Sequence, residues 1–340
     1  MHRIDLKNYE IRTDLAIEAT SNLNNIKKNE KIIDNIKVTN IYLDKKTHKL
    51  INKKIGNYTT IEFDDITDYN KKETVKKVFS SELRKLLKKL SIREDDSCLV
   101  IGLGNISSTP DALGPLTIQN ILVTNHLFDV ANVEDGFRRV GAISPGVKGS
   151  TGIETSDIIK GIVDKVKPSF VIVIDALASQ SIERVNKTIQ MTDAGIHPGS
   201  GIGNNRKEIS KETLDIPVIA IGVPTVVDAV TIVSDTINYM HKHFTYMKNN
   251  INKTNKLIPI NKINYLKEQI DVTIEDKKNL LGMIGNLNES EIKQLIYEVL
   301  SPIGYNLMVT PKEINFVIDK LSDVIGNGIN RALHKNVNNL

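Results

Sequence analysis

Cysteine and tryptophan are nearly missing from this chain of 340 residues, which holds one cysteine, Cys98, and no tryptophan. A single cysteine permits neither an internal disulfide nor a cysteine-based metal cluster. No apolar run approaches the roughly 18–20 residues that a membrane-spanning helix needs, and the first seven residues lack the apolar stretch of a signal peptide. We therefore expect a soluble, cytoplasmic protein with no membrane partner.

An excess of charge of one sign is also lacking, because 45 basic and 41 acidic residues leave a net charge of only +4. Residues 1–96 carry +5, residues 97–242 carry −3, and residues 243–340 carry +2. A surface that follows nucleic-acid phosphates needs like charges gathered on one face. Here the lysines are spread over the flanks and interleaved with acids, so we expect no direct contact with nucleic acid.

The acidic middle third contains an alternation of short apolar runs and amphipathic stretches, which is typical of βαβ units. The runs are rich in β-branched residues, as strands covered on both faces are; they lie at 98–103, 169–174 and 216–221. The stretches 155–166 and 225–243 predict helices, the second with Thr225 as its cap. This pattern predicts an α/β fold of three layers, with a mostly parallel sheet and helices on both faces.

Further elements flank this core. A strand at 38–43 and a helix at 71–90 precede it, and helices at 289–300 and 311–333 follow a polar stretch. The last helix should have Thr310 as its cap and Pro311 at its first position. Its apolar residues form one stripe typical of a core-facing helix; they are Ile314, Val317, Ile318, Leu321, Ile325 and Ile329.

Composition suggests where the chain divides. We expect an N-terminal α/β extension packed on the core over 15–96 and the catalytic α/β core over 97–243. Residues 244–340 should form an irregular excursion, polar as far as 285, and C-terminal helices that belong to the same compact unit.

Two aspartates follow predicted strands, and ligands of open parallel sheets collect beyond the carboxyl ends of strands. Asp111 lies after a glycine turn, in the first turn of a predicted helix, where backbone N–H groups favour the ionised carboxylate. Asp175 follows five apolar residues, and a carboxylate there is costly unless it is paired or protonated. If the strands are neighbours, the two carboxylates form a coupled pair able to activate water and protonate a leaving amine.

A glycine-dense segment, 192–204, follows the second strand and would allow close approach to a substrate backbone. Its candidate supporting or substrate-binding residues are Asp193, His197, Gly199, Ser200 and Gly201. His197 together with Asp111 and Asp175 would make a metal triad, and an ordinary structural histidine is the other interpretation.

Several other chemistries find no match. The turn at 102–107 lacks the third glycine of a dinucleotide fingerprint, and no P-loop lysine follows it. Ser200 lacks the spacing of a nucleophile elbow, and Cys98 lies inside an apolar strand, where a thiol is inert. We expect no cofactor and no bound metal.

Several motifs occur in order and resemble the germination protease family, the spore endopeptidases of spore-forming Firmicutes. They are Thr109-Pro110-Asp111-Ala112-Leu113-Gly114-Pro115, Gly152-Ile153-Glu154-Thr155-Ser156-Asp157, Ile174-Asp175-Ala176-Leu177-Ala178, His197-Pro198-Gly199-Ser200-Gly201, Gly222-Val223-Pro224-Thr225-Val226-Val227-Asp228-Ala229, Leu300-Ser301-Pro302 and Asn306-Leu307-Met308-Val309-Thr310-Pro311-Lys312-Glu313. The likeness runs from about residue 9 to residue 334. The core is also similar to the hydrogenase-maturation endopeptidases, whose acidic residues at strand ends recognise a metal in the substrate.

The resemblance implies an endopeptidase that degrades small acid-soluble spore proteins during germination. It implies an atypical aspartic peptidase whose catalytic residues are Asp111 and Asp175. It also implies a zymogen that trims its own amino terminus, a homotetramer, and a cytoplasmic location in the forespore and spore core.

The family's substrates are cut after an acidic residue and before a large apolar residue followed by alanine. Residues 13–18, Thr-Asp-Leu-Ala-Ile-Glu, match this pattern. The resemblance therefore predicts self-cleavage between Asp14 and Leu15, with residues 1–14 as the propeptide. Two alternatives stay open: a metal-recognising maturation-type peptidase with His197 as a ligand, and a non-catalytic module that binds spore proteins.

Overall fold

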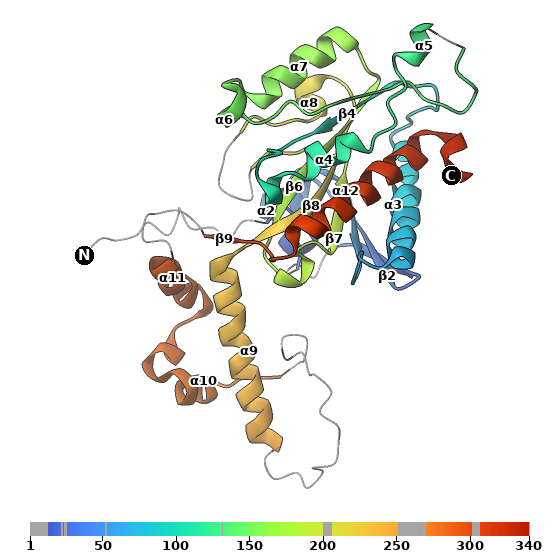
Figure 1. The fold of residues 1–340 in the computed structure, drawn as a ribbon. Coiled ribbons are helices and arrows are strands. Elements are labelled where there is room, and N and C mark those ends of the chain that lie inside the picture. Colours follow the sequence, from blue (N-terminus) through green and yellow to red (C-terminus); the bar gives the residue numbers. More distant parts are fainter. Residues whose placement is uncertain are drawn as a thin grey trace. The chain divides into compact units, whose positions relative to one another are not determined.

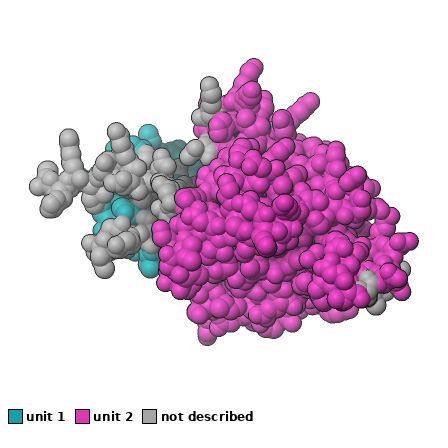
Figure 2. Space-filling view, turned by 90° about the horizontal axis from the view of Figure 1, so that it is seen from above, with its two compact units in different colours: residues 1–11, 227–309 teal, residues 12–226, 310–340 magenta. Residues whose placement is uncertain are grey.

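The computed structural model describes residues 13–21, 23, 26–51, 53–130, 132–199, 206–250, 265, 270–300 and 307–339. The chain divides into two compact units, which Figure 2 colours separately. The larger comprises residues 12–226 and 310–340, and the described part of the smaller lies within residues 227–309. The expected extension, most of the expected core and the last helix lie together in the larger unit, whereas the described part of the smaller unit begins at residue 227 instead of at the expected boundary 243/244.

The larger unit is built on a mixed sheet whose strand order is β1-β2-β3-β7-β8-β6-β4-β5 (Figure 1). The strands are β1 Lys28–Ile33, β2 Ile36–Leu43, β3 Gly56–Glu62, β4 Cys98–Gly102, β5 Val140–Ile143, β6 Phe170–Ser179, β7 Thr188–Thr192 and β8 Val218–Asp228. Strand β4 pairs in parallel with β5 and β6, whereas β7 pairs antiparallel with both β3 and β8. The predicted α/β class is confirmed.

Helices cover both faces of this sheet (Figure 1). The helices of the larger unit are α1 Ala16–Ala19, α2 Lys45–Ile51, α3 Tyr69–Lys89, η2 Thr109–Asp111, α4 Leu113–Gln119, α5 Leu127–Val130, α6 Lys148–Thr151, α7 Thr155–Val166, η3 Ile182–Arg184, α8 Lys211–Leu214, α12 Ile314–Leu333 and η6 Lys335–Asn339. The period-two alternation of the strands divides their side chains between two apolar clusters. On β6, Ile172 and Ile174 enter the cluster under α3, α4 and α12, while Val171 and Val173 enter the one under α7 and α8.

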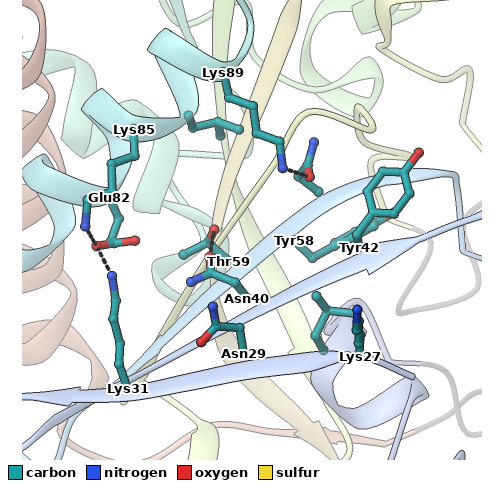
Figure 3. A pocket seen from close by; sticks show the side chains of 13 residues that line it. Lys27, Asn29, Lys31, Asn40, Tyr42, Tyr58, Thr59, Glu82, Lys85 and Lys89 are labelled. Atoms are coloured by element: carbon teal, nitrogen blue, oxygen red, sulfur yellow. Dashed lines mark hydrogen bonds and ion pairs between the residues drawn. The ribbon is translucent and has the colours of Figure 1, made fainter. Parts of the chain in front are cut away.

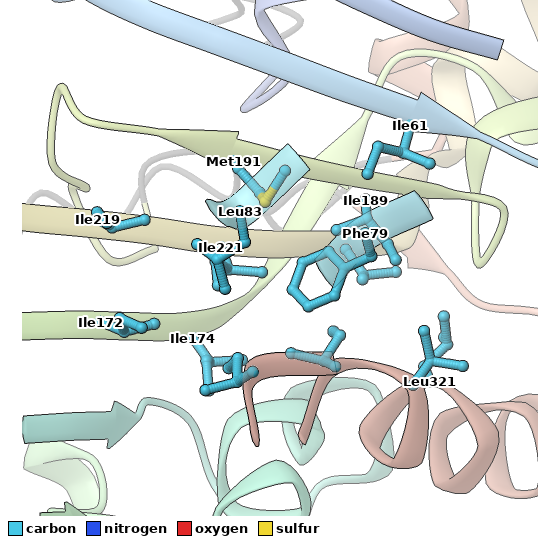
Figure 4. Close-up of a cluster of buried hydrophobic side chains, with 14 of the residues drawn as sticks. Ile61, Phe79, Leu83, Ile172, Ile174, Ile189, Met191, Ile219, Ile221 and Leu321 are labelled. Carbon is cyan, nitrogen blue, oxygen red and sulfur yellow. The ribbon is translucent and has the colours of Figure 1, made fainter. Parts of the chain in front are cut away.

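The first cluster is the larger, and Figure 4 shows its centre. Phe79 and Leu83 of α3 and Leu321 of α12 pack there against isoleucines from β3, β6, β7 and β8. The predicted apolar stripe of α12 is buried apart from Val317, which is partly buried. This packing confirms that the stripe faces the core.

The predicted helix caps are wrong. Strand β8 continues through Thr225 to Asp228, so that Thr225 lies within a strand. Helix α12 begins at Ile314 after Glu313, and the Thr310 hydroxyl donates to the Thr225 carbonyl instead of capping. In both places a contact made by the folded sheet replaces the local capping bond.

The smaller unit contains α9 Ala229–Asn250, α10 Ile274–Leu281, η5 Gly282–Asn286, α11 Glu289–Leu300 and β9 Met308–Val309. Val230 of α9 packs with Ile296 and Tyr297 of α11 in a buried cluster of its own. Helices thus occupy part of the stretch 244–285, where an irregular excursion was expected. Among the described residues, no helix is both long enough and apolar enough to cross a lipid bilayer.

A test of the fold concerns Gly114, where α4 packs against the end of β4. A Cβ at this position would lie 2.2 Å from the Leu103 carbonyl oxygen, which is backbone and cannot move aside cheaply. Gly114→Ala should therefore lower the free energy of unfolding by about 1–3 kcal/mol, measured by urea denaturation. Gly161→Ala on α7 is the matched control, since no heavy atom lies within 4 Å of its added Cβ. Equal stability of the two variants would contradict this packing.

Candidate active site

Asp111 is held at the carboxyl end of β4 by a tight turn. Its carboxylate accepts the Asn105 N–H at 2.9 Å. Gly104 has a φ of 112°, and a Cβ there would lie 2.0 Å from the Asp111 carbonyl oxygen, so only glycine fits. The glycine turn that the sequence displays is therefore what brings Asp111 back against the end of the strand.

Asp175 lies inside β6 rather than after it, because β6 runs on to Ser179. Its neighbour β4 ends at Gly102, opposite Ile174. Asp175 is therefore the first residue of β6 beyond the end of β4. The residue is 5% exposed, and its carboxylate accepts the Ala176 N–H at 3.0 Å.

Burial and like charges set the protonation of this pair. The pKa of Asp175 is raised well above its ordinary value, first by burial and then by the charges of Asp111 and Asp14. Burial also raises the pKa of Asp111, against the Asn105 N–H and the Arg206 charge, which lower it. A backbone N–H favours the ionised form of Asp111, as expected, but desolvation outweighs this hydrogen bond, so that the net shift of the pKa is upward. Two carboxyls with raised pKa values suit a shared proton.

The segment that contains Asp14 and Leu15 lies along β6. The Asp14 N–H donates to the Ala178 carbonyl at 3.1 Å, and the Ala178 N–H donates to the Asp14 carboxylate at 2.9 Å. The charge of Asp14 acts on Asp175. The structure therefore brings Asp14, Asp111 and Asp175 into one neighbourhood.

Side chains from other elements hold the backbone of this segment. Gln190 of β7 accepts the Ala16 N–H at 2.7 Å and donates to the Asp14 carbonyl at 3.0 Å. The Lys53 ammonium donates to the Thr13 carbonyl at 2.6 Å, and burial lowers the pKa of this lysine. The peptide bond between Asp14 and Leu15 is thus fixed from both sides.

Leu15 and Ala16 are completely buried. They belong to an apolar cluster with residues of β2, β3 and β6; these include Ile41, Leu43, Tyr58 and Leu177. The large side chain of Leu15 and the small one of Ala16 are thus both enclosed by apolar side chains.

Glu18 anchors the far end of the segment. Its carboxylate accepts the Gln180 N–H at 2.7 Å and the Ser179 hydroxyl at 2.8 Å, and it lies 3.2 Å from the Arg184 guanidinium. A buried carboxylate with this many donors is well satisfied.

The other predicted site residues lie in the loop that follows β7. Asp193 accepts two hydrogen bonds from Asn57, at 2.6 Å and 2.5 Å, and so ties this loop to β3. His197 is half exposed and lies 3.5 Å from Glu208. Gly199 has a φ of 73°, while Ser200 and Gly201 lie outside the described residues. The supporting role predicted for these residues stays a prediction.

The metal triad was the alternative interpretation of His197. In the part of the chain that the structure describes, no three His, Cys, Asp or Glu side chains gather as metal ligands. The partner given to His197 is the carboxylate of Glu208.

A groove elsewhere in the larger unit, with a volume of about 340 Å³, is lined by residues of β1, β2, β3 and α3 (Figure 3). Glu82 lies 2.7 Å from the ammonium groups of both Lys31 and Lys85. The residues that line this groove include none of the aspartates described above. In this groove, Lys31 and Lys85 are therefore paired with Glu82 and not with the aspartates of the site.

Fold and site together define an α/β protein in which a buried carboxyl, Asp175, and a partly buried one, Asp111, interact beside a bound segment of the same chain. A family model described as germination protease matches residues 4–340. Germination proteases from Geobacillus sp. (strain WCH70) and Bacillus licheniformis are each 51% identical, with 98% of this chain and 96% of the relative covered. The chain belongs to the germination protease family, and it is a peptidase.

One solved structure, the [NiFe] hydrogenase maturation protease HycI from Thermococcus kodakarensis KOD1, matches with a TM-score of 0.28 and 17% identity. The match covers 42% of this chain and 80% of that chain.

Sequence reasoning missed three residues of this site: Gln190, Arg206 and Lys53. Gln190 lies in β7, which was not predicted because strands were sought as continuous apolar runs. In β7, the polar residues Thr188, Gln190 and Thr192 alternate with only two apolar ones. Arg206 and Lys53 belong to no motif. Their roles arise from chain segments brought together by folding.

The raised pKa of Asp175 predicts a pH-dependent stability. A carboxyl that holds its proton more tightly in the folded chain gives stability that is present below its ordinary pKa and lost as the pH rises through the raised value. Asp175→Asn removes this loss. The variant should therefore gain in free energy of unfolding over the natural chain as the pH rises from about 4 to about 8.

Urea denaturation at several pH values measures this difference. Asp164→Asn changes an exposed carboxylate on α7 and should follow the natural chain throughout. If the difference in free energy of unfolding between Asp175→Asn and the natural chain stays constant with pH, the raised pKa of Asp175 is ruled out.

Proposed function

We propose that this chain is a self-processing endopeptidase of spore germination, in which Asp111 and Asp175 activate a water molecule. Its first substrate is its own peptide bond between Asp14 and Leu15, so that residues 1–14 are a propeptide. The observation that carries the proposal is that Asp14 is hydrogen-bonded in both directions to Ala178 of β6, the strand on which the buried Asp175 lies three residues earlier. The clamped backbone around this bond supports it further.

The chemistry follows from one shared proton. The ionised member of the pair takes a proton from water, and the resulting hydroxide forms a bond to the carbonyl carbon of Asp14. The protonated member supplies the proton that the Leu15 nitrogen takes up as the C–N bond breaks. Water is thus divided between the two products, and the pair ends with one proton, as it began.

Specificity follows from the contacts of the segment. The Ala178 N–H supplies a donor to the acidic side chain before the bond, while the buried positions of Leu15 and Ala16 suit a large and then a small apolar residue. These contacts agree with the pattern that the family resemblance implies. We propose that small acid-soluble spore proteins are the further substrates and that they bind to the same site in the spore core. We also propose that the chain assembles as a homotetramer.

Fewer observations support the two alternatives. A metal-recognising peptidase needs His197 as a metal ligand, but its side chain lies beside the carboxylate of Glu208 and, among the described residues, forms no metal-binding group with Asp111 and Asp175. A non-catalytic module needs no buried carboxyl such as that of Asp175, and such a group is costly to maintain without a function.

The first test replaces each carboxyl by its amide. Asp111→Asn and Asp175→Asn should each slow self-processing by about 10²–10⁴-fold or more, because neither amide can exchange a proton with water. Intact mass spectrometry of the purified full chain over time detects loss of the first fourteen residues.

Asp164→Asn is the matched control and should process at the natural rate. Circular dichroism confirms that each variant is folded. Removal of residues 1–14 at the natural rate in either dyad variant would overturn the proposal, as would a new amino terminus other than Leu15.

A second test concerns the apolar pocket. Leu15→Asn places a polar amide of similar size among buried apolar side chains, which costs about 1–3 kcal/mol. Processing should slow by about 10- to 100-fold. Leu15→Met keeps the apolar character and should process within a few-fold of the natural chain. Equal rates for the Asn and Met variants would show that this pocket does not select the bond.

A further inference from the structure

Gln190 is a buried glutamine whose side chain contacts both sides of the peptide bond at Asp14. It is 5% exposed and lies in the middle of β7, between β3 and β8. A buried carboxamide is stable only when its donor and acceptor are both satisfied. Here the acceptor Oε1 receives the Ala16 N–H and the donor Nε2 binds the Asp14 carbonyl.

The orientation of this carboxamide follows from its partners. A carbonyl oxygen can only accept and a backbone N–H can only donate. The NH₂ group of Gln190 must therefore face Asp14, and its oxygen must face Ala16. Leu15, between them, is extended, with φ −83° and ψ 124°.

Gln190 and Asp175 share one face of the sheet. On β7, Ile189 and Met191 enter the cluster under α3 and α12, so Gln190 faces the other way. On β6, Val171 and Val173 mark the face on which Asp175 lies, and this face is again the one away from α3 and α12.

A glycine lies beside Gln190 on the strand between them. Gln190 pairs with Gly222 of β8, and β8 lies between β7 and β6. A Cβ at Gly222 would lie 2.5 Å from the Leu177 side chain, which belongs to the cluster around Leu15. The glycine keeps this face open for the segment that carries Leu15.

We infer that Gln190 is a catalytic residue that stabilises the oxyanion formed on the carbonyl oxygen of the cleaved bond. When hydroxide adds to the Asp14 carbonyl carbon, the π electrons move to the oxygen that Gln190 Nε2 already contacts at 3.0 Å. A donor at this distance in a buried site stabilises the charged oxygen more than the neutral carbonyl. As the C–N bond breaks, the carbonyl re-forms with its hydrogen bond intact.

Through its Oε1 contact with Ala16, the same side chain sets the register of the segment, so the two ends of one carboxamide align the bond with the carboxyl pair. This inference rests on the proposed function, because it takes the bond between Asp14 and Leu15 as the substrate. It assigns a third group to the reaction, with a task that neither aspartate performs.

The test measures self-processing of the full chain with Gln190 changed. Gln190→Met keeps the size but removes both polar ends, and Gln190→Glu keeps the acceptor but loses the donor when ionised. Each should slow removal of residues 1–14 by about 10²–10³-fold at neutral pH. Thr188→Val is the matched control, since it lies on the same face of β7 and its buried hydroxyl has no hydrogen-bond partner among the described residues.

A readout specific to the donor is the pH dependence of the ratio of each variant's rate to the natural rate. Protonated glutamic acid regains a donor, so the ratio for Gln190→Glu should rise as the pH falls, whereas that for Gln190→Met should stay flat. Taking ratios removes the pH dependence of the aspartate pair itself. A purely structural role would give two flat ratios.

The outcomes separate this inference from the proposed function. If Asp175→Asn blocks processing while Gln190→Met processes at the natural rate, the role of Gln190 is wrong and the carboxyl pair stands. If Asp175→Asn processes normally, the proposed function fails first. If Gln190→Met unfolds, Gln190→Glu at low pH still decides, because recovery there supports the donor and its absence overturns it.

Discussion

The desolvation of Asp175 is the constraint on which the rest of the site depends. An ionised carboxylate costs several kcal/mol to bury, so this group must keep its proton or acquire partners. The structure supplies one backbone N–H and surrounds the carboxyl with two further acids, which raises its pKa instead of lowering it. The apolar sheet tolerates this arrangement because its remaining side chains pack closely on both faces. A looser site would admit water and return the carboxyl to its ordinary acidity.

The alternation of side chains along three strands links the core to the site. Alternate residues in the middle of β6, β7 and β8 enter the cluster under α3 and α12, so the residues between them face away from that cluster, towards the cluster under α7 and α8 or towards the bound segment. Asp175, Gln190 and Gly222 occupy such positions. A one-residue slip of β6 or β7 would bury Asp175 or Gln190 in the main core. Hydrophobic packing on one face therefore fixes the geometry of the chemistry on the other.

Much of the fold was predictable because its signals are local. The helices at 155–166 and 289–300 have the predicted bounds, and a glycine turn after an apolar run was enough to single out Asp111. The misses share a physical cause, namely that they depend on contacts distant in sequence. Burial raises the pKa of Asp111, and a longer strand replaces the helix cap expected at Thr225. The role of Gln190 depends on residues 14 and 16, which contact it only in the folded chain.

Under the proposed mechanism, an acidic residue before the cleaved bond does more than fill a subsite. The Asp14 carboxylate accepts the Ala178 N–H, which recognises it. Its charge also raises the pKa of Asp175, so the substrate helps to keep the proton that the leaving nitrogen requires. An amide at this position would keep a hydrogen-bond acceptor but lose the charge. Recognition and catalysis would then separate: binding through Ala178 would persist while the protonation of the pair shifted. The preference for an acid at this position is thus a consequence of the same electrostatics that define the pair.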